Sequence, residues 1–224
     1  MLRSAIMSPA SQEARRFLFP LHLTNALLFV TWWLWPWTWP EVLGLFTLFI
    51  LLALFIGYFF RDPERTVPSD PNLIVSAADG LVTGVDEMDE PDFRLGRMRR
   101  IAVFLSVFDV HVNRAPFEAR VTKTAYKPGK FLDARHPDAS TGNECLAWRL
   151  ESSRGPVAIR QIAGLIARRI VAWSGEGKAV ARGERIGMIR FGSRTEVFVP
   201  LECAILVKPG DRVKGAATPI ARWP

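Results

Sequence analysis

The chain has 224 residues, a formal net charge of +7 and two cysteines. This length fits one medium domain, or a smaller domain joined to a membrane segment. Two cysteines are too few for a disulfide framework, and neither lies in a CxxC or Cys/His cluster. We therefore interpret Cys145 and Cys203 as ordinary thiols, compatible with a reducing compartment, and we expect no bound metal.

The positive charge balance fits either anionic lipid headgroups or nucleic acid as a partner. Each Lys or Arg near an anionic membrane surface contributes about 1 kcal/mol to binding. The sequence has no C2H2 spacing, no RNP-like aromatic motif and no long basic run. We therefore expect a membrane surface as the partner and no nucleic acid.

Residues 17–60 form a long apolar segment whose only acidic or basic side chains are His22 and Glu41. At about 20 residues per span, the segment is too long for one transmembrane helix and fits two. A break is expected in the sequence WPWTWPE, because Pro36 and Pro40 interrupt helix geometry and Glu41 is costly in hydrocarbon.

We therefore predict a helical hairpin, about 18–35 and 42–60, that makes residues 1–60 an N-terminal membrane anchor. Five tryptophans crowd residues 32–39, which is typical of an aromatic belt at the membrane surface. Basic residues flank both outer ends of the hairpin and are absent from its turn: Arg15, Arg16, Arg61 and Arg65. This pattern places both termini in the cytoplasm and suits a bacterial inner membrane. The alternative is a buried hairpin of a soluble protein; a cleaved signal peptide fits poorly.

Residues 61–224 are predicted to form a mainly β soluble domain. Short β-branched or aromatic segments bounded by Gly, Pro and Asp predict strands, at 73–77, 81–88, 100–108, 119–126 and 155–164. The segment QIAGLIARRI, 161–170, predicts a short helix.

A weak internal repeat adds detail to the predicted β domain. Residues 177–189 and 210–220 share a Gly, a Val three residues later, a second Gly and an apolar strand. Each copy resembles the turn-plus-strand units of lipoyl-like barrel-sandwich domains. Neither copy places a lysine at a hairpin tip as a lipoyl or biotin acceptor does, so a carrier function is not supported. The expected fold is thus a β domain with barrel-sandwich elements behind a two-helix hairpin.

Three positions are candidates for chemistry. Gly192-Ser193 lies between two strand-like segments, where such a pair is ordinarily a turn, and it lacks the GxSxG context of a hydrolase. If 101–113 is one strand, its period of two puts Asp109, His111 and Asn113 on one face. His111 is then either a half-buried histidine bonded to Asp109 or a general base. Asp79, followed by a glycine, is on composition alone a turn residue.

Several short motifs occur together in a fixed order: FFRDPER, AADG, FLSVFDVHVNRAP, YKPGKF, NE, QIAGLIARRI and GERIGMIRFGSR. This series, over about residues 58–200, resembles the phosphatidylserine decarboxylase family, particularly its shorter branch. Each motif is weak by itself, whereas the ordered set is specific.

The resemblance implies a proenzyme that makes its own cofactor. Ser193 would attack the Gly192 carbonyl, and elimination would divide the chain into 1–192 and 193–224, leaving a pyruvoyl group in place of Ser193. Asp79 and His111 match family positions tied to a Ser-His-Asp-like arrangement, in which the Asp orients the His and the His accepts the serine proton. The cleaved enzyme would then be a heterodimer of its own two chains, with further oligomerisation open.

The resemblance also implies the reaction. The pyruvoyl ketone would form a Schiff base with the amine of phosphatidylserine in the bilayer and accept the electrons released as CO2 departs. The product would be phosphatidylethanolamine. His111 would position the carboxylate or reprotonate the carbanion, and Asn113 and Arg114 would contact the substrate. The hairpin would hold this site beside the membrane, on its cytoplasmic side.

Two positions depart from the longer branch of the family. That branch has a second histidine where this chain has Arg114, and Leu-Gly-Ser-Thr where this chain has Phe191-Gly192-Ser193-Arg194. One imidazole would then serve both cleavage and decarboxylation, or Arg114 would bind phosphate. Two alternatives remain: decarboxylation of another phosphoserine lipid, such as an archaetidylserine, and a non-catalytic membrane-anchored β-sandwich adaptor.

Overall fold

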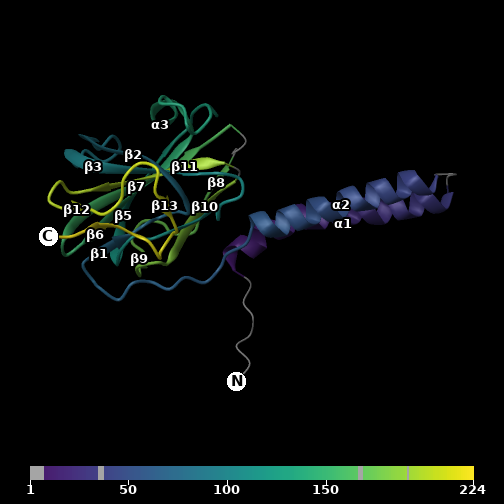
Figure 1. Cartoon of the computed structure of the whole chain (residues 1–224), viewed down its shortest axis with the longest axis horizontal. Helices are drawn as coiled ribbons and strands as arrows, with labels where there is room; N and C mark the ends of the chain where they lie inside the picture. The colour runs from purple at the N-terminus through teal and green to yellow at the C-terminus, as the bar shows by residue number, and fades with distance from the viewer. Residues whose placement is uncertain (1–7, 35–37, 166–168, 191) are drawn as a thin grey trace, which may run out of the picture. The chain divides into compact units, whose positions relative to one another are not determined.

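The computed structural model describes residues 8–34, 38–165, 169–190 and 192–224 (Figure 1). The chain divides into two compact units, Met1–Pro63 and Glu64–Pro224. The first contains two long helices and the second is built almost entirely of strands. The two units are described separately below.

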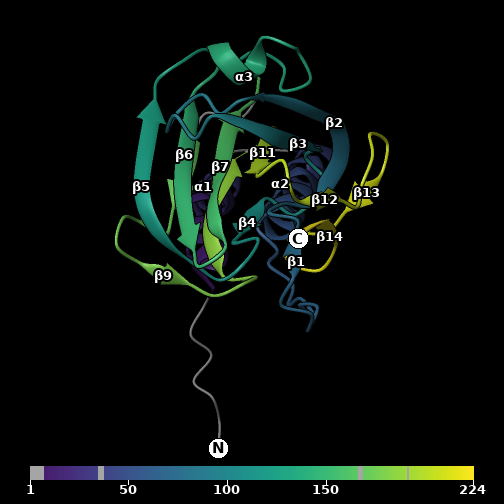
Figure 2. The same cartoon turned by 90° about the vertical axis from the view of Figure 1, so that its left-hand side faces the viewer.

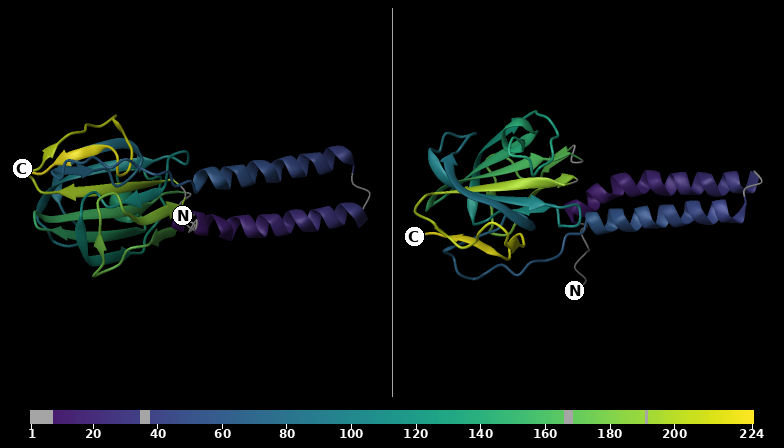
Figure 3. Two further views of the ribbon diagram at one scale, coloured as in Figure 1. Left: turned by 90° about the horizontal axis from the view of Figure 1, so that it is seen from below. Right: turned by 45° about the horizontal axis from the view of Figure 1, so that its top comes forward.

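The first unit is an antiparallel pair of helices, α1 (Pro9–Leu34) and α2 (Trp39–Phe59), as Figure 3 shows. Aromatic pairs join the helices at both ends, with ring centroids 5.3 Å apart for Trp32 and Trp39 and 5.5 Å apart for Phe17 and Phe60. Both helices are long and apolar enough to cross a membrane. The predicted hairpin of two helices is therefore present, although α1 begins well before the predicted residue 18.

The start of α2 differs from the expectation for Pro40 and Glu41. Pro40 does not interrupt a helix but lies in the first turn of α2, where a missing N–H costs no hydrogen bond. The Glu41 carboxylate accepts hydrogen bonds from the Thr38 backbone N–H and hydroxyl, each 2.9 Å long, and closes a capping box. The other expected breaker, Pro36, lies outside the described residues.

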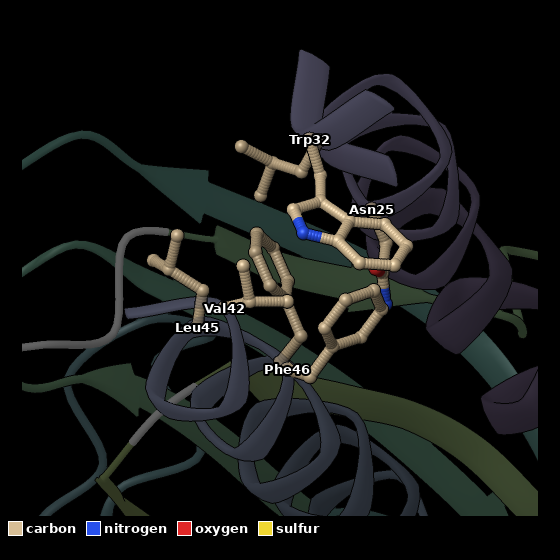
Figure 4. Close-up of a pocket in the computed structure, with 7 residues that line it drawn as sticks. Asn25, Trp32, Val42, Leu45 and Phe46 are labelled. Carbon is tan, nitrogen blue, oxygen red and sulfur yellow. The ribbon is translucent and has the colours of Figure 1, made fainter. Parts of the chain in front are cut away.

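A small apolar pocket lies between the two helices (Figure 4). Asn25 and Trp32 of α1 face Val42 and Phe46 of α2 across it. The cavity measures about 10 Å³, which is close to the space that one water molecule needs. The pocket is therefore a packing gap in the hairpin and is too small for a lipid chain.

The second unit contains one eight-stranded sheet and two three-stranded sheets, and every pairing between named strands in the described residues is antiparallel. The large sheet has the order β13 (Arg212–Val213), β2 (Gly80–Asp89), β3 (Arg97–Leu105), β11 (Ser193–Val199), β7 (Gly155–Ala163), β6 (Cys145–Ser152), β5 (Ala119–Lys127) and β9 (Ala179–Val180). The small sheets are β1 (Leu73–Val75), β14 (Pro219–Arg222) and β12 (Ala204–Ile205), and β4 (Val112–Arg114), β10 (Arg185–Arg190) and β8 (Arg169–Ala172). One short helix, α3 (Ala139–Gly142), precedes β6.

The large sheet curls into a half-barrel, which Figure 2 shows from β5 and β6 through β7 to β2. Its concave face holds the main core, in which Trp148, Leu105, Ile159 and Val197 are almost completely buried. Such alternating, β-branched strands can bury one face in this way because successive side chains point to opposite sides. The mainly β architecture behind two apolar helices is thus confirmed.

The internal repeat has a structural counterpart. Its first copy contains β9 and β10, and its second contains β13 and β14. β9 and β13 form the two opposite edges of the large sheet, while β10 and β14 are the central strands of the two small sheets. The two copies therefore occupy equivalent places at the two ends of the half-barrel.

Two predictions of secondary structure are wrong. The segment 101–113 is not one strand, because β3 ends at Leu105 and a turn separates it from β4. The segment 161–170 is not a helix where it is described: residues 161–163 end β7, and Arg169 begins β8. The apolar residues of this segment have helical spacing, but strand pairing decides their structure. The end of β7 pairs with β6 and β11, and β8 pairs with β10.

Candidate functional site

Ser193 is the first residue of β11, the central strand that joins the two halves of the large sheet. It pairs with Leu105 of β3 on one side and Ala163 of β7 on the other. Its side chain is completely buried, and among the described residues its Oγ has no hydrogen-bond partner. A buried hydroxyl without a partner costs free energy, so its presence at this position calls for a chemical reason.

Gly192 precedes Ser193 in the left-handed region, at φ +65°. A residue with a Cβ adopts this conformation only at a cost of about 1–2 kcal/mol, whereas glycine adopts it freely. The Gly192 N–H donates a hydrogen bond of 3.1 Å to Nε2 of His111. The candidate base therefore holds the N–H of Gly192, in the peptide unit that precedes the Gly192–Ser193 bond.

His111 is completely buried immediately before β4. Its Nδ1 lies 3.0 Å from the backbone carbonyl oxygen of Asp109. Because a carbonyl can only accept, Nδ1 carries the proton; because the Gly192 N–H can only donate, Nε2 does not. The two contacts together select the neutral tautomer with a basic Nε2 lone pair at the Gly192 peptide.

The turn between β3 and β4 supplies the Asp109 carbonyl. The Asp109 carboxylate accepts hydrogen bonds from the N–H (2.9 Å) and hydroxyl (2.7 Å) of Ser106, and lies 3.3 Å from Nη1 of Arg212. The sequence pattern correctly associates Asp109 with His111, but the backbone oxygen makes the contact. The carboxylate instead accepts the Ser106 hydrogen bonds that close the turn, and this turn orients the Asp109 carbonyl oxygen toward His111.

Asp79 is engaged elsewhere in the structure. One carboxylate oxygen lies 2.7 Å from Nη2 of Arg65, and the other accepts a 2.8 Å hydrogen bond from the Gly215 N–H. Gly80, the next residue, packs directly against the Phe104 carbonyl at the end of β3. Asp79 is thus placed near the β3 end at which Ser193 pairs, and its role in orienting His111 stays a prediction.

Gly164 is a residue that the sequence motifs contain but that pattern reasoning did not single out. A Cβ at Gly164 would overlap the Gly192 carbonyl oxygen and lie 3.3 Å from the Ala134 side chain. The absence of a side chain at 164 therefore lets the Gly192 carbonyl approach the end of β7. The signal for this role is the glycine after a β-branched strand, which marks a close backbone approach.

A group of buried polar side chains continues inward from Ser193. Asn113 Oδ1 accepts hydrogen bonds from the Gln161 side-chain amide and from Thr195 Oγ1, the latter at 3.3 Å. All three residues are fully buried, and among the described residues Asn113 Nδ2 and Gln161 Oε1 lack partners. The structure therefore brings Asn113 to the strand of Ser193 and adds Gln161 and Thr195, which the sequence did not single out.

Arg114 lies at the end of β4. It is buried, and its Nη1 donates a 3.1 Å hydrogen bond to the Gly183 carbonyl. Its strand partner is Arg185 on β10. A contribution of Arg114 to substrate binding stays a prediction.

The opposite face of β11 carries a buried ion network centred on Glu196. Its carboxylate, which is completely buried, lies 2.8 Å from Arg160 Nη1 on β7 and 3.1 Å from Arg100 Nη1 on β3. Ser140 of α3 donates a 2.6 Å hydrogen bond to Glu196 and accepts one of 2.7 Å from Arg194. This network ties residues 194 and 196 to both neighbouring strands and to α3.

The two thiols take no part in this site. Burial raises the pKa of Cys145 to about 12 and that of Cys203 to about 11, so both remain protonated near neutral pH. Among the described residues no group of three or more His, Cys, Asp and Glu side chains could hold a metal ion. The chemistry available at the site is that of a serine hydroxyl, an imidazole and a glycine carbonyl.

Comparison with known proteins identifies this arrangement. The family model described as phosphatidylserine decarboxylase matches residues 52–221. The phosphatidylserine decarboxylase proenzyme of Symbiobacterium thermophilum is 49% identical over 174 residues, which cover 77% of this chain and 81% of that protein. The proenzyme of Syntrophus aciditrophicus is 49% identical over 172 residues, 76% of this chain and 81% of that protein. The proenzyme of Desulfotalea psychrophila is 43% identical over 172 residues, 76% of this chain and 80% of that protein.

The chain is thus a carboxy-lyase that is made as a proenzyme. The chain belongs to the phosphatidylserine decarboxylase family, and its function is that of a phosphatidylserine decarboxylase proenzyme in phospholipid biosynthesis. This family assignment confirms the resemblance drawn from the ordered motifs and excludes the non-catalytic adaptor.

The ion network predicts a large effect of Glu196→Gln on stability. Removing the buried charge weakens the hydrogen bonds of Arg100 and Arg160 to residue 196, although Asp86 and Asp92 still pair with these two arginines, so the free energy of unfolding should fall by about 1–3 kcal/mol. Urea denaturation in detergent, followed by the tryptophan fluorescence to which the buried Trp148 contributes, measures the change. The matched control is Glu87→Gln, which removes a half-exposed carboxylate from Arg97 and Arg99 and should cost less than about 1 kcal/mol. Equal effects of the two changes would contradict the buried network.

Proposed function

We propose that this decarboxylase matures by cleaving its own chain between Gly192 and Ser193. The observation that carries the proposal is the buried, unpartnered Ser193 hydroxyl next to a left-handed glycine whose N–H is bound to neutral His111. A hydroxyl that no hydrogen bond restrains is free to approach the preceding carbonyl. A histidine with an unprotonated Nε2 at the Gly192 N–H, one peptide unit before the bond to be cleaved, supplies a base.

The first step of this cleavage replaces an amide with an ester. Ser193 Oγ adds to the Gly192 carbonyl carbon while its proton passes to His111; the C–N bond then breaks, and the proton goes to the departing amine. Gly164 supports this step because it leaves room for the Gly192 carbonyl oxygen to change position as the carbon becomes tetrahedral.

The second step breaks the ester. Loss of the Ser193 α-proton and of the Cβ–O bond leaves Gly192 with a free carboxylate and residue 193 as a dehydroalanine. Addition of water and loss of ammonia convert that residue into an N-terminal pyruvoyl group. The residues present fit such a group, because the position at the start of β11 is buried, held on both sides by strand pairing and surrounded by unpartnered polar atoms.

A pyruvoyl group supplies a carbonyl that reacts with amines and withdraws the electrons released as CO2 leaves. The chain's own side chains then bind and orient the serine headgroup of phosphatidylserine. Asn113 Nδ2 and Gln161 Oε1 are a buried donor and a buried acceptor that meet no partner among the described residues. They support a role in holding the polar headgroup, and His111 is the group that holds or returns the proton.

In the cleaved enzyme the Glu196 network would connect the two chains. Arg194 and Glu196 would be the second and fourth residues of the chain 193–224, whereas Ser140, Arg100 and Arg160 would belong to the other chain. Their ion pairs and hydrogen bonds hold the new chain end against the sheet. The two products of cleavage therefore remain together as a heterodimer.

The two helices serve as a membrane anchor in this proposal. Their length and apolar composition suit two spans of a bacterial inner membrane, and the capping box at Thr38 satisfies the start of α2 at the turn. Arg15, Arg16 and Arg61 lie at the open end of the hairpin, which supports a cytoplasmic position for both termini and for the catalytic unit.

Ser193→Ala should abolish cleavage because it removes both the nucleophile and the leaving oxygen. Intact-mass analysis of the purified protein should find one unbroken 25.2 kDa chain for the variant and two chains, 1–192 and 193–224, for the wild type. Borohydride should modify only the cleaved wild type, at the new N-terminus. The matched control, Ser153→Ala in the exposed turn after β6, should cleave normally. An active wild-type protein with an uncleaved chain would overturn the mechanism.

Gly164→Ala should slow cleavage strongly. Its methyl group would overlap the Gly192 carbonyl oxygen, and relieving such overpacking costs about 1–3 kcal/mol, or roughly a tenfold to hundredfold rate change if the strain falls on the reacting peptide. The measurement is the rate at which the full-length chain disappears after synthesis. Gly175→Ala, whose Cβ would have no atom within 4 Å, is the control and should cleave at the wild-type rate. Normal cleavage by Gly164→Ala would show that the carbonyl does not need this space.

The orientation of the anchor predicts which side of the membrane each end of the hairpin faces. Thr38→Cys, in the turn, should react in intact cells with a maleimide that cannot cross the inner membrane, whereas Ser11→Cys should react only after lysis. The native thiols should give little background because both are buried. Labelling of residue 11 but not residue 38 in intact cells would reverse the proposed orientation.

A further inference from the structure

The rim around the cleavage site carries two exposed apolar side chains. Phe108, in the turn between β3 and β4, is 64% exposed, and Leu165, directly after β7, is also 64% exposed. Single exposed apolar residues are ordinary on protein surfaces, so only their location relative to the cleavage site can indicate an interaction surface.

Both residues adjoin the reacting peptide. Val107, the neighbour of Phe108, has its Cγ1 3.8 Å from the place where a Cβ on Gly192 would lie. Gly164, the neighbour of Leu165, packs against the Gly192 carbonyl. The two loops that carry the apolar tips, Phe108 and Leu165, thus border Gly192 through Val107 and Gly164.

Basic side chains accompany these tips. Arg212, whose side chain is 71% exposed, lies 3.3 Å from the carboxylate of Asp109, the residue after Phe108. Arg169, which is exposed, begins β8 on the other side of the rim. Apolar tips flanked by cations are the composition of a surface that enters the headgroup layer of an anionic membrane.

We propose that this rim, formed by Phe108, Leu165, Arg169 and Arg212, docks on a bilayer surface that contains anionic phospholipid. The inference rests on the proposed function, since Ser193 is completely buried and the lipid headgroup must reach it from the membrane. Phe108 and Leu165 enter the boundary between headgroups and acyl chains, while Arg169 and Arg212 contact the phosphates. The opening of the site then faces the lipid directly, and phosphatidylserine need not cross water to reach Ser193.

Depth measurements test the docking in the full chain. Phe108→Cys and Leu165→Cys, each labelled with an environment-sensitive NBD dye, are reconstituted into vesicles of phosphatidylcholine with and without phosphatidylglycerol. Both dyes should shift to the blue and be quenched by doxyl-labelled lipid, more strongly in the anionic vesicles. A dye at Ser153→Cys is the control, because the turn after β6 lies at the opposite end of the sheet from Ser193. Dyes at 108 and 165 as exposed to water as the dye at 153 would overturn the proposal.

Kinetics provide a second, independent test. The double change Phe108→Ser with Leu165→Ser should lower the rate on phosphatidylserine in bilayers by about tenfold and leave the rate on monomeric short-chain phosphatidylserine unchanged. Tyr126→Ser removes an apolar side chain of similar exposure, 62%, from β5, three strands away from β11. It should leave both rates unchanged.

Failure of the docking proposal and failure of the proposed function would give different results. An equal loss on both substrates would place Phe108 and Leu165 in the reaction itself and overturn docking. A wild-type protein that decarboxylates neither form of the lipid would refute the proposed function, and the dye measurement would still decide whether the rim docks.

Discussion

The position of Gly192, which contacts His111 through its N–H and Gly164 through its carbonyl oxygen, is the constraint on which the rest of the site depends. His111 Nε2 binds its N–H, and Gly164 leaves room for its carbonyl oxygen. These contacts keep residue 192 at positive φ and hold the buried Ser193 directly beside it. Each contact comes from a different element, so the peptide is oriented only when the end of β7 and the approach to β4 are both in place.

The half-barrel supplies that placement through β11. This strand pairs along its length with β3 and β7, and both of its faces are buried. The concave side carries Thr195 and Val197 into the core, whereas the convex side carries Glu196 into its ion network. A strand that is held on both edges and both faces keeps its position after its own N-terminal peptide bond is cut. The architecture would therefore allow the proposed cleavage of the chain without loss of the site.

The apolar hairpin and the rim would have two different roles at the membrane, anchoring and orientation. In the proposed arrangement a two-span anchor would keep the catalytic unit at the bilayer, but would not by itself fix the orientation of that unit. Apolar tips on the loops that border Gly192 would select the orientation in which the buried site opens to the headgroups. Anchoring would thus raise the local concentration of substrate, and docking would decide which face of the protein meets it.

The sequence by itself determined the class of each segment and, through its ordered motifs, the family. Apolar runs and flanking charges depend only on composition, which is why the hairpin and most strands follow from them. The sequence could not show that a turn divides 101–113, that Asp109 reaches His111 through its backbone, or that residues 161–163 and 169–170 lie in strands. Those features, with the roles of Gly164 and Glu196, arise from contacts between residues far apart in the chain. Only the tertiary structure decides them, because pairing and close approach depend on partners that no local pattern contains.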